Sequence, residues 1–115
     1  MHKVIVTGGL GFIGSNLIDL LIKKNYFVIN IDKLSYSSNK YNLADLSNKN
    51  YRFIKSDIGN KKIIHKTLKK FKPKIIFNLA AETHVDRSID DPSPFIKSNI
   101  LGLFNLLEVI RKYHK

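Results

Sequence analysis

The sequence predicts an α/β fold in which helices cover both faces of a parallel sheet of about four strands. Short β-branched, apolar runs alternate with segments whose apolar residues recur at helical spacing. This alternation is typical of a doubly wound sheet, whose first four strands take the spatial order 3-2-1-4. Glycine-rich or polar residues follow the expected strands at their carboxyl ends, where such sheets bind ligands.

The expected elements follow one another without an internal repeat or an interdomain linker. Strands are expected over residues 4–7, 27–31, 51–55 and 74–80, and residues 33–50 read as a polar loop. The first helix covers residues 12–24, the second is capped by Asn60 and stops before Pro73, and the last begins at Ser93 and Pro94. The expected buried stripes of these helices are, in order, Ile13, Leu17, Leu20 and Leu21; Ile64, Leu68 and Phe71; Ile96, Ile100, Leu103, Leu107 and Ile110.

Length and composition limit the class of protein. A chain of 115 residues is one domain or part of one. It has no cysteine, and therefore no disulfide framework and no thiolate metal site; no metal site is expected. No apolar run is long enough to cross a bilayer, and the first residues lack the layout of a signal peptide. These features favour a cytoplasmic protein that is not bound to a membrane.

The net charge of +11 raises the alternative of a nucleic-acid-binding protein. The lysines are scattered over helices and loops, and no basic motif is interleaved with aromatic residues. A solvated basic surface is therefore the favoured interpretation, and no nucleic-acid partner is expected. Such a surface could still attract an anionic nucleotide substrate.

Three glycines, Gly8, Gly11 and Gly14, stand between the first expected strand and the first expected helix. A tight turn and close backbone approach to a pyrophosphate both favour glycine, and the helix start offers N–H groups and a partial positive charge. The spacing thus predicts a dinucleotide site, although glycines after a strand also make ordinary turns. A hydrolase phosphate loop is disfavoured, because Ser15 and Asn16 follow the last glycine instead of a lysine.

Two carboxylates end the next two strands. Asp32 lies 18 residues after Gly14, where a carboxylate can accept the ribose hydroxyls of NAD and repel the 2′-phosphate of NADP. Lys33 follows directly and could soften that preference. Asp57 could meet the adenine amino group, and both aspartates could instead cap turns.

Residues 78–88 form the second informative segment. Ala80 and Ala81 are small enough to let a cofactor lie against the backbone at the strand end. Glu82, Thr83 and His84 would then face the place where a nicotinamide and a substrate meet. A surface-loop histidine is the alternative reading of His84, and residues 86–87 read as a local ion pair.

These segments together resemble the extended short-chain dehydrogenase/reductase family, with its Rossmann-type NAD domain. Within that family the pattern is most similar to the nucleotide-sugar dehydratases that act on dTDP-glucose. Residues 7–16, 32–36, 57–58, 79–89 and 95–100 carry the resemblance, and Leu10 stands where these enzymes usually have alanine. The NAD-binding residues that it implies are Gly8, Gly11, Phe12, Ile13, Gly14, Asp32, Lys33, Leu34, Ser35, Asp57, Ile58, Leu79, Ala80, Ala81, Glu82, Thr83 and Ser98. It also implies that Thr83 and His84 touch the nucleotide sugar.

By this resemblance the chain is the N-terminal part, about a third, of a homodimeric enzyme. The family's catalytic Tyr-x-x-x-Lys helix and Asp–Glu pair, and its sugar-binding domain, have no counterpart in these 115 residues. Tyr36 and Lys40 match the tyrosine–lysine spacing, but they fall in the loop after the second strand. No catalytic residue is therefore assigned, and the chain alone is expected to be inactive. A UDP-sugar epimerase or dehydratase of the same superfamily, and a non-catalytic NAD-binding module, remain open alternatives.

Overall fold

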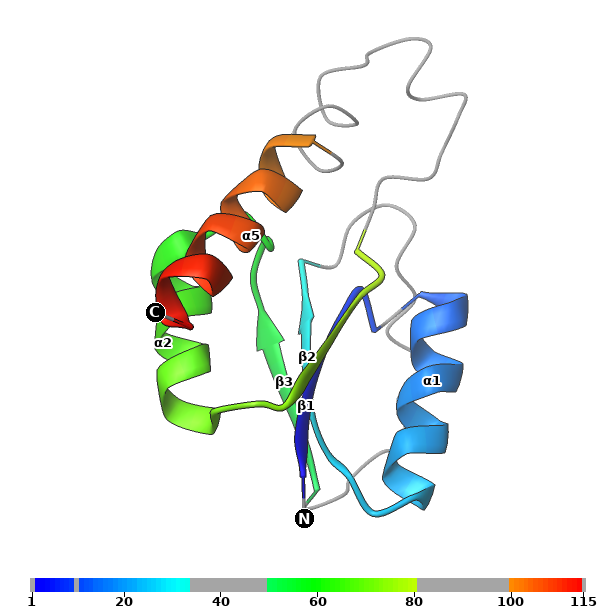
Figure 1. The fold of residues 1–115 in the computed structure, drawn as a ribbon. Helices are drawn as coiled ribbons and strands as arrows, with labels where there is room; N and C mark the ends of the chain where they lie inside the picture. Colours follow the sequence, from blue (N-terminus) through cyan, green and yellow to red (C-terminus); the bar gives the residue numbers. More distant parts are fainter. Residues whose placement is uncertain (1, 10, 34–49, 81–99, 115) are drawn as a thin grey trace, which may run out of the picture.

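The computed structural model describes residues 2–9, 11–33, 50–80 and 100–114. These residues form four strands and three helices that alternate along the chain (Figure 1). Their order is β1 (Lys3–Thr7), α1 (Phe12–Lys23), β2 (Phe27–Asp32), β3 (Tyr51–Lys55), α2 (Lys61–Phe71), β4 (Ile75–Asn78) and α5 (Gly102–Tyr113). Residues 34–49 of the expected polar loop and the expected cap at Ser93 and Pro94 lie outside the described residues.

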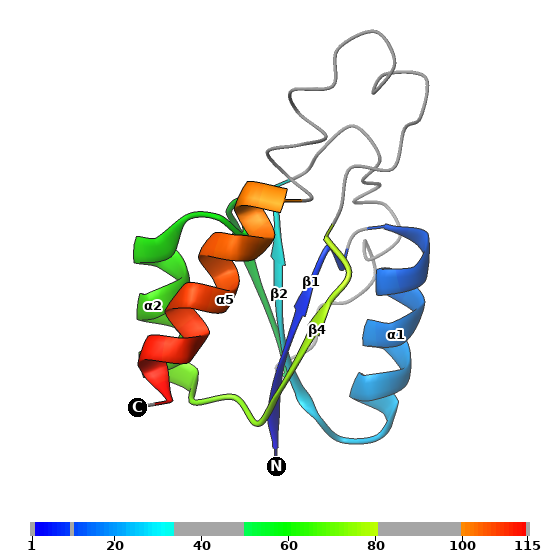
Figure 2. The same ribbon diagram turned by 45° about the horizontal axis from the view of Figure 1, so that its top comes forward.

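The four strands form one parallel sheet in the order β3-β2-β1-β4, which confirms the order expected from the sequence. Helix α1 covers one face of the sheet, and α2 and α5 lie together on the other (Figures 1 and 2). Since all strands run the same way, their carboxyl ends share one edge. The start of α1 lies at that same edge (Figure 2).

Helix boundaries follow local chemistry that the sequence already carries. Asn25 has a φ of 67°, a left-handed conformation that asparagine tolerates better than most residues, and it ends α1. The Oδ1 atom of Asn60 accepts a hydrogen bond from the N–H of Ile63 at 3.2 Å, which confirms the predicted N-cap of α2. Lys72, also left-handed, ends α2 just before Pro73.

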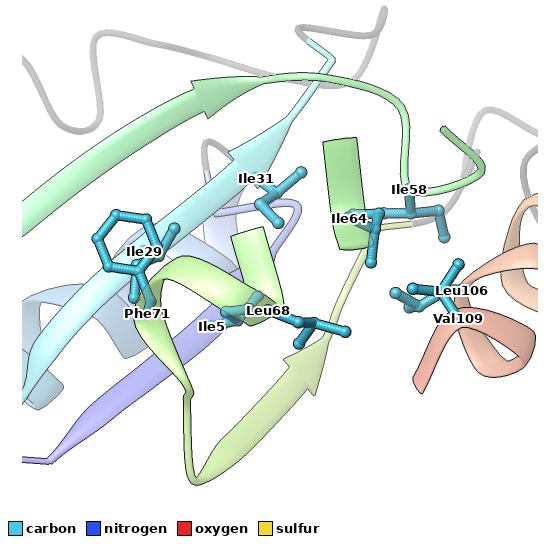
Figure 3. Packing of buried hydrophobic residues seen from close by; sticks show 9 residues of the cluster. All are labelled: Ile5, Ile29, Ile31, Ile58, Ile64, Leu68, Phe71, Leu106 and Val109. Carbon is cyan, nitrogen blue, oxygen red and sulfur yellow. The ribbon is translucent and has the colours of Figure 1, made fainter. Parts of the chain in front are cut away.

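The larger core cluster lies between the sheet and the α2–α5 layer (Figure 3). Isoleucines of β1 and β2 point toward the buried faces of both helices. The buried members of this larger cluster are Ile5, Ile29, Ile31, Ile58, Ile64, Leu68, Phe71, Leu106 and Val109. The α2 stripe predicted from the sequence is confirmed in full, because Ile64, Leu68 and Phe71 all belong to it.

A smaller cluster lies between the sheet and α1. It consists of Val4, Val6 and Val28 from the strands and Ile18 and Leu21 from the helix. Successive residues of a strand point to opposite faces, so β1 and β2 each supply side chains to both clusters. This explains why these central strands read as nearly continuous apolar runs.

The predicted stripes of α1 and α5 are wrong in part. Leu21 is buried as predicted, but Ile13 and Leu20 are 70% and 50% exposed, and Ile18, which was not predicted, is fully buried. On α5, Leu106 and Val109 are buried, whereas Leu107 is 55% exposed. Both helices carry more apolar residues than one face can bury, so periodicity alone did not select the face that meets the sheet.

This correction is testable with two neighbouring leucines of α5. Leu106→Ala should lower the free energy of unfolding by about 2–5 kcal/mol, because it removes buried methyl groups and leaves a cavity. Leu107→Ala should lower it by less than about 1 kcal/mol, because that side chain is mostly solvated. Urea unfolding of the two variants measures both changes, and equal losses would contradict the observed orientation of α5.

Candidate functional site

The predicted site residues that the structure describes gather at the carboxyl edge of the sheet. The glycine segment follows β1, Asp32 ends β2, Asp57 follows β3, and Leu79 and Ala80 follow β4. The strand order places β1 between β2 and β4, so the glycine segment lies between the ends of its two neighbours. This arrangement confirms that segments distant in sequence meet at one edge.

Gly8 makes the turn that leaves β1. Its φ of 71° is strained for residues with a side chain, and its N–H donates to the carbonyl oxygen of Ile31 at 2.9 Å. A Cβ at this position would lie 2.8 Å from the backbone nitrogen of Ala80, which is closer than real contacts allow. Gly8 is therefore required twice, by its conformation and by the approach of the chain after β4.

Gly14 and Gly11 differ in what surrounds them. A Cβ at Gly14 would lie 2.3 Å from the carbonyl oxygen of Gly8, so Gly14 permits the start of α1 to pack on the turn. A Cβ at Gly11 would meet only that same oxygen, at 3.5 Å. No described part of the protein therefore excludes a side chain at Gly11. Its open side is free for close approach by a ligand.

Helix α1 begins at this edge, and within the described residues no side chain caps its first N–H groups. Gly11 is its N-cap and provides no side-chain acceptor, and the first turn has no acidic residue. The N–H of Ser15 donates to the carbonyl oxygen of Gly11 at 2.9 Å. By helix geometry, the N–H groups before Ser15 point out of the helix end and favour an anion there. Phe12 and Ile13, in this first turn, are both exposed.

The carboxylates that end β2 and β3 have different surroundings. Asp32 is only 4% exposed, and its carbonyl oxygen accepts a hydrogen bond from the N–H of Ser56. Asp57 is exposed; one carboxylate oxygen accepts from the N–H of Gly59 at 2.8 Å, and the other lies 3.9 Å from the Nζ of Lys33. The turn-capping reading of Asp57 is thus correct for one of its oxygens. The Lys33 contact is a surface ion pair of small energetic weight.

Ile58 and the end of β4 show which atoms a ligand could reach. The Ile58 side chain lies in the core cluster against α2 and α5, which leaves its backbone for a ligand. Leu79 is exposed and Ala80 is half-buried. Strand β4 stops at Asn78, two residues earlier than expected. The N–H of Leu79 donates to both the carbonyl oxygen and the hydroxyl of Thr7, and the N–H of Ala80 donates to the hydroxyl.

Thr7 is a residue whose role the sequence reading missed. Its buried hydroxyl accepts from the two N–H groups at the end of β4 and donates to the Oδ1 atom of Asn78. One donor and two acceptor sites are all that a hydroxyl offers, so the side chain is fully satisfied. Thr7 therefore joins the end of β1 to the end of β4, where the cofactor was expected to lie against the backbone.

A second missed group connects the glycine turn to β2. The Oδ1 atom of Asn30, which is 0% exposed, accepts from the N–H of Gly9 at 2.9 Å, and its Nδ2 atom donates to the Tyr51 hydroxyl at 3.1 Å. Burial raises the pKa of Tyr51 and outweighs the opposite effect of its hydrogen bond with Asn30; nearby Asp32 raises it further. A single asparagine within an apolar strand was the signal that could have found this group.

The remaining predicted positions lie outside the described residues, and their assignments stay predictions. They are Leu34, Ser35, Tyr36, Lys40, Ala81, Glu82, Thr83, His84 and Ser98. Within the residues that the structure describes, no group of three or more His, Cys, Asp or Glu side chains could hold a metal ion.

Within the described part of the chain, every helix is too short or too polar to cross a membrane.

The sheet order, the glycine turn and the helix that starts behind it define a Rossmann-type α/β protein. The profile of the GDP-mannose 4,6 dehydratase family matches residues 5–115, nearly the whole chain. The chain belongs to this family.

Curated relatives and solved structures agree with that assignment. The dTDP-glucose 4,6-dehydratase of Salmonella typhimurium is 46% identical over 113 residues, which are 96% of this chain and 31% of that protein. The chain thus spans about a third of the length of the curated relatives it matches.

Two solved structures are similar to the described fold. The dTDP-glucose 4,6-dehydratase of Streptomyces venezuelae, solved with NAD and TYD bound, has a TM-score of 0.89 and 34% identity, covering 97% of this chain and 36% of that one. The UDP-glucose 4-epimerase of Thermotoga maritima, solved with UDP-glucose, has a TM-score of 0.86 and 38% identity, covering 96% of this chain and 34% of that one.

The different surroundings of Gly14 and Gly11 predict different costs of adding a methyl group. Gly14→Ala should lower the free energy of unfolding by about 1–3 kcal/mol, because the new Cβ would overlap the Gly8 carbonyl and force the turn and helix apart. Gly11→Ala, the matched control, should change it by less than about 1 kcal/mol, since its Cβ has room. Chemical denaturation measures both, and a harmless Gly14→Ala would contradict the observed packing.

Proposed function

We propose that the chain is the NAD-binding, N-terminal portion of a nucleotide-sugar dehydratase that converts dTDP-glucose to dTDP-4-keto-6-deoxyglucose and water. The observation that carries this proposal is one shared edge, which holds a glycine turn, an uncapped helix start and a buried carboxylate on the adjacent strand. The dehydratase name comes from the curated relatives, which are 41–46% identical along this chain.

The pyrophosphate of NAD would lie over Gly11 and the start of α1. The open side of Gly11 supports this placement, because a phosphate can approach the backbone there without meeting a side chain. The outward-pointing N–H groups of the first turn would donate to the phosphate oxygens. Exposed Phe12 and Ile13 would contact the cofactor beside the glycines.

Asp32 would accept hydrogen bonds from the adenosine ribose. It lies at the end of β2, directly beside the end of β1, and a carboxylate there disfavours the 2′-phosphate of NADP. Lys33, the next residue, could soften that preference; its ammonium group lies 3.9 Å from a carboxylate oxygen of Asp57. Asp57 and the backbone of Ile58 would border the adenine, and Leu79 and Ala80 the nicotinamide side.

The residues of this chain would bind and orient; they would not carry out the chemistry. When bound, NAD would supply the hydride acceptor and donor for an internal oxidation and reduction of the sugar. The tyrosine, lysine and acid–base pair of the family would belong to the remaining two thirds of the enzyme. Thr83 and His84 would touch the nucleotide sugar, and Ala81, Glu82 and Ser98 the cofactor.

A UDP-sugar 4-epimerase is the second candidate. The Thermotoga maritima epimerase is slightly more identical to this chain than the Streptomyces venezuelae dehydratase is, and the two TM-scores are similar. The fold of these residues therefore supports both activities equally. Curated relatives that are 42–46% identical along this chain are named as dehydratases and favour that activity. A non-catalytic NAD-binding module, a homodimer of the whole enzyme and a cytoplasmic location stay predictions.

Replacing the buried carboxylate tests the cofactor site. Asp32→Ala should weaken NAD binding by about 1–3 kcal/mol, because hydrogen bonds between the ribose hydroxyls and a charged acceptor are lost. Asp19→Ala, which removes an exposed carboxylate paired with Lys23 on α1, is the matched control and should leave the affinity unchanged. Calorimetric titration with NAD and NADP measures both, and an unaltered NAD affinity in Asp32→Ala would remove the ribose assignment.

A chimaera tests the activity of the whole enzyme. Residues 1–115 would replace the matching third of the Salmonella typhimurium dehydratase, so that the relative supplies the rest of the protein. We expect the chimaera to form the 4-keto-6-deoxy product from dTDP-glucose, and residues 1–115 alone to form none. A second chimaera would join residues 1–115 to the matching remainder of the Thermotoga maritima epimerase. If only this second chimaera is active, and it forms the epimerised sugar, the result would support the second candidate.

A further inference from the structure

The first two amides of the glycine turn are both bound to β2. The N–H of Gly8 donates to the backbone carbonyl of Ile31, whereas the N–H of Gly9 donates to a side chain, the Oδ1 atom of Asn30, at 2.9 Å. Gly9 itself is buried, and its surroundings leave no room for a side chain. A Cβ there would lie 2.3 Å from both Asn30 Oδ1 and Ile18 Cδ1.

We propose that Asn30, held in place by Tyr51, is a positioning residue that sets the orientation of the glycine turn toward the pyrophosphate of the cofactor. The inference rests on the proposed NAD-binding function and deepens it. Asn30, Tyr51 and Gly9 are not among the site residues expected from the sequence. Asn30 acts through the backbone and is not itself placed in contact with the ligand.

The strand register explains how one side chain can do this. Asn30 is paired with Val6 of β1, one residue before Thr7 at the end of that strand. Strand alternation places Asn30 on the same face as Val28, toward α1, and this is the face over which the glycine turn crosses. The amide oxygen of Asn30 therefore lies beneath the turn, where a strand backbone atom cannot reach.

The Gly9 N–H can only donate, so it determines that the amide oxygen of Asn30 faces the turn. The Tyr51 hydroxyl accepts a hydrogen bond from Nδ2 of Asn30 at 3.1 Å and holds the other end of the amide in place. Tyr51 also packs against the cluster beneath α1. A rotated Asn30 amide would place two N–H donors against the donor of Gly9, which is unfavourable in a buried site.

The same strand then connects two parts of the proposed cofactor site. Asn30 holds the turn that would face the pyrophosphate, and Asp32, two residues later on β2, would hold the ribose. An apolar residue at position 30 would pack as well against Ile18 and Val28, but it would leave the Gly9 N–H buried without a partner. The turn would then tilt to find an acceptor, and the amides after Gly9 would tilt with it.

The test uses Asn30→Leu in the 115-residue chain and three ligands, NAD, ADP and adenosine. We expect the affinities for NAD and ADP to fall by the same factor, about tenfold or more, because both contain the pyrophosphate that the turn would contact. The affinity for adenosine, which has no phosphate, should not change. Calorimetry or ligand-detected NMR measures all three, with each value referred to the folded fraction of the variant.

Thr67→Val is the matched control. Thr67 is a buried residue of α2 whose hydroxyl donates to the carbonyl oxygen of Ile63, on the face of the sheet opposite the glycine turn. This variant should be less stable, but its affinities for NAD and ADP should not fall relative to its affinity for adenosine. If Asn30→Leu lowers the affinities for all three ligands equally, or lowers none, the positioning role is overturned. If the unaltered chain binds neither NAD nor ADP, the proposed function itself fails, and the role of Asn30 fails with it.

A second variant keeps the inference testable if Asn30→Leu does not fold. Tyr51→Phe removes one hydroxyl and retains the ring, so the fold should persist. We expect faster hydrogen exchange at the Gly9 amide and weaker binding of NAD relative to adenosine, because the Asn30 amide is no longer held. Unchanged exchange at Gly9 together with unchanged NAD affinity would show that Tyr51 does not hold Asn30 in the proposed role.

Discussion

The structure depends on a close approach of backbones at the carboxyl end of β1. Gly8 lies against the backbone of Ala80, and Gly14 lies against the carbonyl oxygen of Gly8. Without side chains at these two positions, the end of β4 and the start of α1 can both pack on the same turn. The pairing of β1 with β2 and β4 and the buried hydroxyl of Thr7 hold the three segments together. Any side chain here would separate the elements that form the proposed site.

This constraint explains why the ligand-facing edge and the core are distinct. The edge is formed by backbone groups, small residues, a few polar side chains and the exposed apolar residues Phe12, Ile13 and Leu79. Stability comes from two apolar clusters on opposite faces of the sheet. Gly11 belongs to the edge but is not needed for its packing, since within the described residues a Cβ there would meet only the Gly8 carbonyl oxygen, at an ordinary contact distance. Within one motif, Gly8 and Gly14 are therefore required by packing, whereas Gly11 is the glycine proposed to face the ligand.

Strand β2 unites the two halves of the proposed cofactor site. Its Ile31 carbonyl and its Asn30 side chain bind the amides of the glycine turn, and its last residue is the carboxylate proposed to hold the ribose. A shift of this strand would move both contacts together.

The sequence by itself determined the α/β class, the strand order, the cap of α2 at Asn60 and the gathering of glycines and aspartates at one edge, because periodicity, caps and glycine spacing are local signals. Only the tertiary structure decided which faces of α1 and α5 are buried, since Ile18 and Leu106 were chosen by contact with the sheet and not by spacing. It also decided the partners of Thr7 and Asn30. Both are ordinary strand residues until neighbouring strands bring backbone N–H groups to their side chains.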